Sequence, residues 1–397
     1  MDPLHQHDEI PEHQDETVHD NQQADISSPS MVPQEDVPPN AQSFSALMNS
    51  DLPEKNIYTR CESGIASVDQ NYPDVFYDLG FQISRIASIG QIKEMLTSCD
   101  ISKAGDYIAA SGHFDGLILW DIRNSTLRGV GLNEGYITDI RFRTDEIAHS
   151  NIFIASSFDG PISIFDADAH CPKFMNPTLP RHSVLPSHGA ISADLHPVKL
   201  SACWLSCDDR VWCWNFEGSI SSYYYFLKGA YGMVRFQPTR GDLLATIIRK
   251  TVVLIDWNTK KIKLLLEGHR YGVLCVSWEP SGRFLASVST DSARIWSIEH
   301  GGACMYTLYL PDTVMTSCVY HTGPANDITV DPQAVIVGTS KGAYLWRPDK
   351  EEVLYTMFPD QRSPLTLLAR AGSPHCKKMG SVSQEGFVRL WEINHLP

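Results

Sequence analysis

The chain has 397 residues, of which 20% are charged, and its formal net charge is −15. Residues 1–75 hold 15 of the 47 acidic residues and two of the 32 basic ones, so the remainder is nearly neutral and lacks the basic face that nucleic-acid binding requires. No run of 18 apolar residues and no secretory signal is present, which excludes a membrane-spanning helix and indicates a soluble intracellular protein.

Residues 1–78 are predicted to form a disordered acidic tail. This segment is rich in Pro, Gln, Asp and His, has few aromatic residues and shows no apolar period. It cannot bury enough apolar surface to offset the entropy of its chain. Its histidines have no partner cluster at a metal-ligand spacing, so we expect no metal site there.

A repeated pattern begins after the tail. Each copy has a hydrophobic strand that ends in small residues, an acidic or polar turn, and a second strand that closes on a bulky residue. The closing residues follow one another on average about every 45 residues, near the roughly 40–45 of a WD repeat. They are Trp120, Phe165, Trp214, Ile255, Trp296, Trp346 and Trp391. The sequence therefore predicts an all-β fold, a seven-bladed WD-repeat β-propeller formed by residues 79–397.

The two ends of the propeller are expected to pair. The last repeat supplies three strands and then ends, so its fourth strand is missing. Residues 81–89 alternate apolar and polar side chains and have the length of a strand. Because an open ring would leave an edge strand exposed, we expect residues 81–89 to fill the missing position.

Two repeats carry a complete set of residues for a buried hydrogen-bond network. In each set an Asp in the tight turn accepts from a His, and a Ser two positions earlier links that His to a Trp indole. The sets are His188, Ser206, Asp208 and Trp214 in the third repeat, and His269, Ser289, Asp291 and Trp296 in the fifth. A satisfied network of this kind stabilises a blade. We therefore predict a structural role, and no catalytic or metal role, for both histidines.

Sequence motifs of catalysis are absent. There is no phosphate-binding glycine loop, no nucleophilic serine elbow and no HExxH motif. None of the ten cysteines forms a CxxC pair, and no zinc-ligand spacing is found. The prediction is a non-enzymatic binding platform without a cofactor, metal or small-molecule substrate.

The top face of the propeller is the predicted binding surface. Loops before the first strand and between the second and third strands of each repeat converge there. Aromatic and Arg side chains are enriched at interface hot spots, and basic ones suit a peptide that mixes Leu with Asp or Glu. The candidates are Phe114, Tyr136, Phe158, Tyr231, Arg249, Arg270, Tyr271 and Lys341. About half of these side chains are expected to pack between blades instead.

Irregular details of the repeats resemble one family of WD-repeat proteins. They lie in residues 137–142, 155–160, 165–168, 195–199, 206–208, 234–238, 278–289 and 317–321. In these stretches the chain resembles the LEUNIG-type plant transcriptional corepressors from residue 79 to the C-terminus. The resemblance implies a nuclear protein that contacts transcription factors, histone deacetylase or Mediator subunits, without touching DNA. The LisH-containing helical module and Gln-rich stretches of that family are absent from residues 1–75.

Two alternatives remain open from the sequence. Trp120-Asp121-Ile122-Arg123 matches the WDxR pattern of substrate receptors of cullin-based ubiquitin ligases, in which Asp121 and Arg123 would contact the ligase adaptor. In an ordinary blade, such an Arg closes a turn. The other alternative is a WD-repeat scaffold of another pathway, and a cytoplasmic location is open beside the nuclear one.

Overall fold

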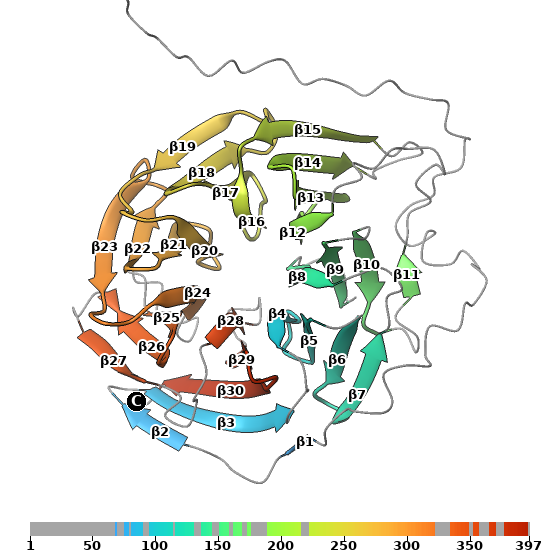
Figure 1. Ribbon diagram of the computed structural model, residues 1–397, viewed down its shortest axis with the longest axis vertical. Coiled ribbons are helices and arrows are strands. Elements are labelled where there is room, and N and C mark those ends of the chain that lie inside the picture. Colours follow the sequence, from blue (N-terminus) through green and yellow to red (C-terminus); the bar gives the residue numbers. More distant parts are fainter. Residues whose placement is uncertain are drawn as a thin grey trace, which may run out of the picture.

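The structure is a computed structural model that describes most residues after 67. The described residues are 68–69, 75–78, 81–89, 95–113, 116–130, 136–144, 151–158, 162–168, 173–175, 189–215, 222–321, 334–348, 352–356, 365–370 and 377–395. They form seven antiparallel sheets arranged as a ring, with the first strand of each sheet nearest the ring axis (Figure 1). The predicted seven-bladed propeller is confirmed. The predicted disordered segment before residue 68 lies outside the described residues.

The first three blades follow the chain order, with the innermost strand first. Blade 1 contains β4 (Leu96–Ile101), β5 (Tyr107–Gly112), β6 (Leu117–Asp121) and β7 (Thr126–Val130). Blade 2 contains β8 (Ile137–Phe142), β9 (Ile152–Ser157), β10 (Ser163–Asp166) and β11 (Lys173–Met175). Blade 3 contains β12 (Ala190–Leu195), β13 (Ser201–Ser206), β14 (Arg210–Asn215) and β15 (Ser222–Lys228).

The remaining blades repeat this order until the last one. Blade 4 contains β16 (Tyr231–Phe236), β17 (Leu243–Ile248), β18 (Thr251–Asp256) and β19 (Ile262–Leu266). Blade 5 contains β20 (Val273–Trp278), β21 (Phe284–Ser289), β22 (Ser292–Ser297) and β23 (Ala303–Tyr309). Blade 6 contains β24 (Met315–His321), β25 (Ala334–Thr339), β26 (Gly342–Arg347) and β27 (Glu352–Thr356). Blade 7 begins with β28 (Leu365–Arg370), β29 (Lys378–Ser383) and β30 (Val388–His395).

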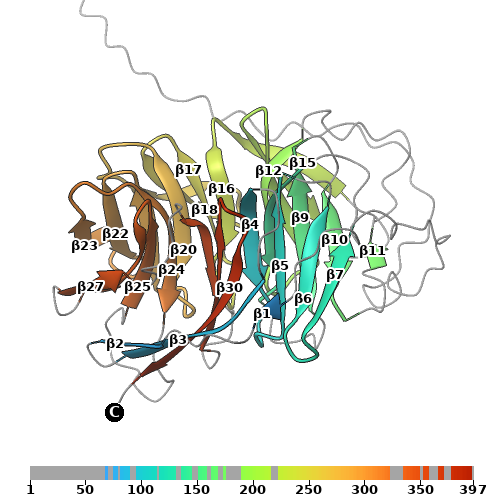
Figure 2. The same ribbon diagram turned by 60° about the horizontal axis from the view of Figure 1, so that its bottom comes forward.

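Blade 7 is completed from the other end of the chain. β3 (Phe81–Ile89) pairs antiparallel with β30 from Phe81↔His395 to Ile89↔Val388, and Figure 2 shows the two strands side by side. The predicted ring closure is confirmed. Two short strands, β1 (Val68–Asp69) and β2 (Val75–Asp78), add to the outer side of β3. They lie before residue 79, where the sequence predicted only the tail.

Every inner strand has an irregularity near its start. In β20 the pairing register with β21 shifts between Val273 and Cys275, and the first strands of the other six blades shift at the corresponding place. A bulge of this kind leaves an extra residue unpaired and re-aims its side chain. Leu274 is that residue in blade 5, and it is 37% exposed.

Hydrogen bonds link the inner strands of neighbouring blades. The Ser98 hydroxyl of blade 1 accepts from the Ile140 N–H of blade 2 at 3.0 Å. The Ser192 hydroxyl of blade 3 accepts in the same way from the Val234 N–H of blade 4 at 3.2 Å. A side-chain acceptor thus joins one blade to the backbone of the next, in addition to the apolar packing between them.

Sulfur atoms replace the serine hydroxyl as acceptor at the contacts between blades 4 and 5 and between blades 5 and 6. The Met233 thioether of blade 4 lies 3.3 Å from the Val276 N–H of blade 5. The Cys275 sulfur of blade 5 lies 3.5 Å from the Cys318 N–H of blade 6. The contact between blades 5 and 6 is therefore made through a thiol.

Candidate functional site

The top face is the end of the ring where the inner strands begin. Four of the predicted aromatic residues are exposed there: Tyr136 (50%), Phe158 (52%), Tyr231 (59%) and Tyr271 (52%). All seven candidates that the structure describes are exposed, so the expectation that about half of the candidates pack between blades is wrong for the described ones. Phe114 lies outside the described residues. Large exposed apolar side chains gathered at one end of a fold are typical of an interaction surface.

The predicted cations Arg249, Arg270 and Lys341 are also exposed on this face. Arg249 lies in the turn between β17 and β18 and adopts a left-handed backbone conformation with φ of 55°. Its carbonyl oxygen accepts from the Val273 N–H at 3.0 Å. This bond places the Arg249 turn beside the loop that carries Arg270 and Tyr271.

We call Tyr231, Arg249, Arg270, Tyr271 and Leu274 the top-face patch. They come from the starts of β16 and β20, the loop that precedes β20 and the turn between β17 and β18. The patch combines three exposed apolar or aromatic side chains with two guanidinium groups. It can therefore hold an apolar side chain next to a carboxylate.

Leu274 was missed by the sequence reasoning. Leu274 stands between the apolar residues Val273 and Cys275. In such an apolar run it is expected to be buried like its neighbours. The bulge exposes Leu274, and its signal is the repeated register shift at the start of every inner strand. A single strand taken alone does not carry this information.

A second aromatic group lies on blades 1 and 2. The rings of His113 and Tyr136 have centroids 5.8 Å apart, and the Phe158 N–H donates to the Tyr136 carbonyl at 3.0 Å. Lys341 lies apart from both groups, in the turn between β25 and β26 of blade 6. The sequence-predicted residues therefore occupy one face but form two aromatic groups and one separate cation.

The buried network of blade 5 contains the predicted residues and two further serines, Ser287 and Ser292. His269 Nδ1 lies 3.1 Å from the Ser289 hydroxyl, which donates to Asp291 at 2.6 Å. The Trp296 indole donates to Ser287 at 2.7 Å, and His269 Nε2 lies 2.6 Å from the same hydroxyl. The link to the indole therefore runs through Ser287 and differs from the predicted link through Ser289.

Burial, together with the nearby Arg294, lowers the pKa of His269 to about 4. The imidazole is therefore neutral at pH 7, so one ring nitrogen donates and the other accepts. Both nitrogens face serine hydroxyls. These contacts are those of a structural histidine.

Blade 3 departs from its predicted set in a similar way. The Ser206 hydroxyl donates to Asp208 as predicted, but the indole that donates to Ser206 is that of Trp212, at 3.1 Å. Trp212 also stacks on Trp204, with ring centroids 5.9 Å apart. Trp214 occupies the predicted place in β14, and His188 lies outside the described residues.

Ser287→Ala is expected to lower the free energy of unfolding by roughly 1–3 kcal/mol, because it leaves two buried polar groups without this hydroxyl. These groups are His269 Nε2 and the Trp296 indole. Urea unfolding of the variant measures the loss. Ser281→Ala, in an exposed turn of the same blade, is the control. Equal stability of both variants would contradict the assignment.

The bottom face carries the predicted ligase-adaptor residues. Both carboxylate oxygens of Asp121 accept from Asn124, one from its backbone N–H at 3.0 Å and one from its side chain at 2.9 Å. Arg123 donates through Nε to Asp106 at 2.7 Å, although its side chain is 70% exposed. Both residues thus stabilise turns of blade 1, and adaptor binding stays a prediction.

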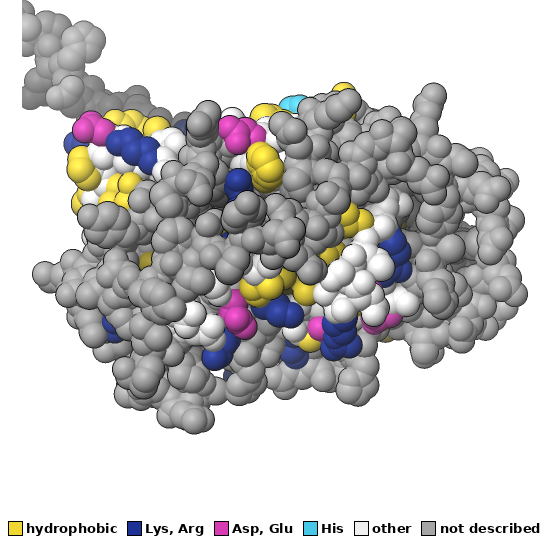
Figure 3. Space-filling view, turned by 90° about the horizontal axis from the view of Figure 1, so that it is seen from below, with side chains coloured by type: hydrophobic (Ala, Val, Ile, Leu, Met, Phe, Trp, Pro, Cys, Tyr) yellow, Lys and Arg dark blue, Asp and Glu magenta, His cyan; other side chains and the backbone are white. Residues whose placement is uncertain are grey.

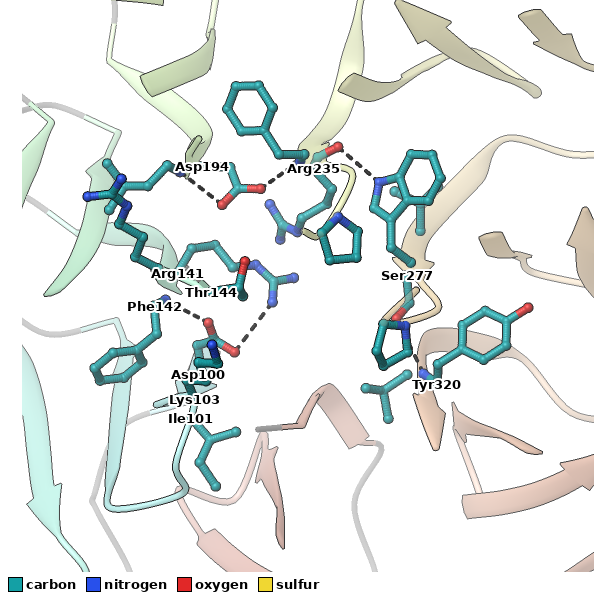
Figure 4. Close-up of a pocket in the computed structure, with 18 of the residues that line it drawn as sticks. Asp100, Ile101, Lys103, Arg141, Phe142, Thr144, Asp194, Arg235, Ser277 and Tyr320 are labelled. Atoms are coloured by element: carbon teal, nitrogen blue, oxygen red, sulfur yellow. Dashed lines mark hydrogen bonds and ion pairs between the residues drawn. The ribbon is translucent and has the colours of Figure 1, made fainter. Parts of the chain in front are cut away.

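The bottom end of the ring axis holds a cavity of about 140 Å³. Four consecutive blades each place a charged residue at the fifth position of the inner strand, in the order Asp100, Arg141, Asp194 and Arg235 (Figure 4). Burial raises the pKa of Asp100, and it raises the pKa of Asp194 to about 6. Negative and positive side chains alternate from blade 1 to blade 4, so each charge is compensated by a neighbour of opposite sign. The four residues thereby link these four blades.

A deeper ion pair crosses the same part of the ring. Arg235 donates to Asp139 through two contacts, Nη1 to Oδ2 at 2.8 Å and Nη2 to Oδ1 at 3.1 Å. Ser192 donates to Asp139 at 2.6 Å. Both charged side chains are only 7% exposed. The pair holds blade 2 to blade 4 across blade 3.

Within the described ranges, no group of three or more His, Cys, Asp or Glu side chains could hold a metal ion. In the same part of the chain, no helix is long and apolar enough to cross a bilayer. In the edge view of Figure 3, basic side chains lie among acidic, polar and hydrophobic ones. Among the coloured residues of that side, the basic side chains form no continuous field.

Comparison with known proteins agrees with this geometry. The WD domain, G-beta repeat, matches residues 260–297, which run from the end of blade 4 through the third strand of blade 5. The chain is a WD-repeat β-propeller. Its seven predicted closing residues all lie in the third strands of their blades.

Three relatives share parts of this propeller. The transcriptional corepressor LEUNIG_HOMOLOG of Arabidopsis thaliana is 27% identical over 318 residues, which cover 79% of this chain and 37% of that protein. The nuclear distribution protein PAC1-2 of Uncinocarpus reesii (strain UAMH 1704) is 26% identical over 41% of this chain and 39% of its own length. WD repeat-containing protein 36 of Homo sapiens is 25% identical over 34% of this chain and 14% of its own length.

The first of these similarities supports the resemblance seen in the sequence. It covers most of the WD-repeat propeller and places the chain near a corepressor-like family. The chain spans less than half the length of the relatives it matches. The similarity therefore bears on the propeller part of those proteins.

Proposed function

We propose that the protein is a non-enzymatic, corepressor-like scaffold that binds short segments of other proteins on its top face. The observation that carries the proposal is the top-face patch, in which Tyr231 and Tyr271 are more than half exposed beside Arg249 and Arg270. Exposed aromatic and Arg side chains of this kind are the residue types of interface hot spots. The propeller supplies a rigid frame for them.

The chemistry of the patch favours a peptide that mixes Leu with Asp or Glu. Leu274 and the tyrosine rings offer apolar contact area. The two guanidinium groups favour carboxylates, which they can bind with paired hydrogen bonds. Such complementarity increases the rate of encounter and discriminates against basic peptides.

The similarity to LEUNIG_HOMOLOG, whose name describes a transcriptional corepressor, supports a role in transcription. In this proposal the protein acts in the nucleus and binds transcription factors, histone deacetylase or Mediator subunits. It acts without direct contact with nucleic acid, in keeping with the near-neutral charge of residues 76–397. It uses no cofactor and no small-molecule substrate.

Arg249→Glu and Tyr271→Ala are each expected to weaken binding of a Leu-rich acidic peptide at least tenfold, or about 1.4 kcal/mol. The first reverses a charge in the patch, and the second removes its central ring. Calorimetric titration of the full chain with a synthetic peptide measures the change. Both side chains are exposed, so the melting temperature should stay the same.

Two matched variants control for these effects. Arg240→Glu reverses an exposed charge in the turn between β16 and β17, at the opposite end of blade 4. Tyr309→Ala removes a ring that is 60% exposed on the outer strand of blade 5. Both should bind the peptide like the parent. If the patch variants also bind like the parent, the partner docks elsewhere, and Arg123→Glu on the bottom face becomes the informative variant.

A further inference from the structure

Two thiols meet at the contact between blades 5 and 6. Cys275 lies on β20 and Cys318 on β24, both are buried, and their sulfur atoms are 4.0 Å apart. The Cys318 backbone N–H points at the Cys275 sulfur over 3.5 Å. The two inner strands are held next to each other at this level by a further bond, from the Tyr320 N–H to Ser277 at 3.3 Å.

The distance of 4.0 Å between the two sulfur atoms is that of neighbouring thiols that have not yet bonded. A disulfide has an S–S length of about 2.05 Å and joins neighbouring backbone segments. Here the sulfur atoms already approach van der Waals contact, and one of them touches the backbone of its partner residue. The two sulfurs must approach each other by about 2 Å, through side-chain rotation of the two cysteines and adjustment of β20 and β24, which belong to neighbouring sheets.

The two sulfurs differ in their electrostatic surroundings. The Cys318 thiol and backbone N–H both donate to Cys275, and together with Arg235 and Arg141 they lower the pKa of Cys275. The same hydrogen bond and burial raise the pKa of Cys318. Cys275 is therefore the more acidic thiol of the pair, and it is the nucleophile when it ionises, because thiolates are the reactive form.

A small oxidant can reach this pair. Cys275 and Cys318 both line the cavity of about 140 Å³ at the bottom of the ring axis. Lys103, Thr144 and Pro280 line it as well and are partly exposed, so the cavity extends to the bottom face. A water molecule takes about 30 Å³ in the liquid, so a molecule of the size of hydrogen peroxide fits.

We propose that Cys275 and Cys318 form a reversible disulfide in response to a hydroperoxide, which covalently links the inner strands of blades 5 and 6. The Cys275 thiolate attacks one peroxide oxygen, the O–O bond breaks, and the Cys275 sulfur becomes a sulfenic acid while hydroxide leaves. The Cys318 sulfur then attacks the Cys275 sulfur, the S–O bond breaks, and hydroxide leaves with the thiol proton as water. Two thiols are oxidised by two electrons and one peroxide is reduced to two waters.

The other cysteines that the structure describes differ from this pair. Cys203 and Cys213 are directly opposite each other in the register of β13 and β14, and burial raises the pKa of both. Burial also raises the pKa of Cys99. Cys304 is exposed, and no second cysteine is described beside it. Among these described cysteines, the pair with one lowered pKa and a neighbouring thiol is that between blades 5 and 6.

Peptide mapping of the full chain after hydrogen peroxide treatment tests the proposal. The folded protein should yield a cross-linked peptide containing Cys275 and Cys318, and a thiol reductant should remove it. Cys318→Ser should lose the cross-link and accumulate a sulfenic acid at Cys275 that a dimedone probe traps. Cys275→Ser should lose both products. Cys304→Ser, which removes an exposed thiol, should give the parent cross-link.

The wild-type chain alone can overturn the proposal, so it does not depend on the variants folding. Absence of the Cys275–Cys318 peptide from the folded, peroxide-treated protein would do so. Its appearance only after denaturant is added would also do so, because the structure would then not bring the two sulfurs together. Circular dichroism before treatment identifies the folded sample.

Discussion

Removing residues 1–90 is expected to abolish the soluble folded protein, whereas removing residues 1–67 should leave the melting temperature nearly unchanged. The longer deletion takes away β3, which pairs with β30 along its whole length. Ala87 of β3 also packs in the core between blades 7 and 1, together with Trp120 and Leu390. The deletion therefore opens the ring and exposes β30 as an unpaired edge.

Thermal unfolding and light scattering of the two truncated proteins measure this difference. The shorter deletion keeps β1, β2 and β3, so it serves as the matched control. Aggregation of the 1–90 deletion alone is the expected result. If both truncated proteins have the melting temperature and the light scattering of the full chain, β3 does not close the ring.

Arg235→Met is expected to lower the free energy of unfolding by about 3–5 kcal/mol, because it leaves a buried carboxylate without its cation. Asp139 and Arg235 are each only 7% exposed, and their two contacts are 2.8 and 3.1 Å long. Desolvation of the remaining charge is the source of the loss. Asp139→Leu should destabilise for the same reason, with Arg235 left unpaired.

The double variant Asp139→Leu/Arg235→Met separates this cause from lost packing. Two apolar side chains replace two compensating charges, so its free energy of unfolding should lie above that of either single variant. Urea unfolding of the four proteins measures the coupling. If the double variant instead loses as much free energy of unfolding as the two single variants together, the broken ion pair is not the cause of their destabilisation.

The architecture follows from the sequence because its signals recur in every blade. Trp296 and its counterparts come about 45 residues apart and all lie in third strands, where they pack between blades. The closing strand was predictable since residues 81–89 alternate and the last repeat lacks one strand. β1 and β2 were not predictable, because they are short and add to an edge that exists only after β3 has paired.

The sequence predicted that buried His, Ser, Asp and Trp side chains form hydrogen-bond networks, but it did not predict which Ser bonds to which Trp. Ser287 and Ser289 are two residues apart, so both point to one side of β21, and the choice between them depends on strand register and reach. The same ambiguity separates Trp212 from Trp214 in β14. Their local sequence allows either contact, and only the three-dimensional spacing decides that Ser287 and Trp212 make the bonds.

The sequence predicted which face of the propeller carries the candidate residues, but it did not predict which of them lie next to one another. Turn positions identified Arg249 and Tyr271 as top-face residues, and both are exposed. Their proximity depends on the bond between the Arg249 carbonyl and the Val273 N–H, which joins blade 4 to blade 5. Contacts between blades of this kind have no signature within one repeat.

A tethered reporter assay tests the central proposal most directly. The full chain is fused to a heterologous DNA-binding domain, and transcription of a reporter with the matching sites is measured. The proposal predicts that the wild-type fusion lowers transcription, that Arg249→Glu/Tyr271→Ala restores it at equal protein level, and that Arg240→Glu still represses. A wild-type fusion without effect, or a patch variant that represses fully, would contradict a corepressor-like role for the top face.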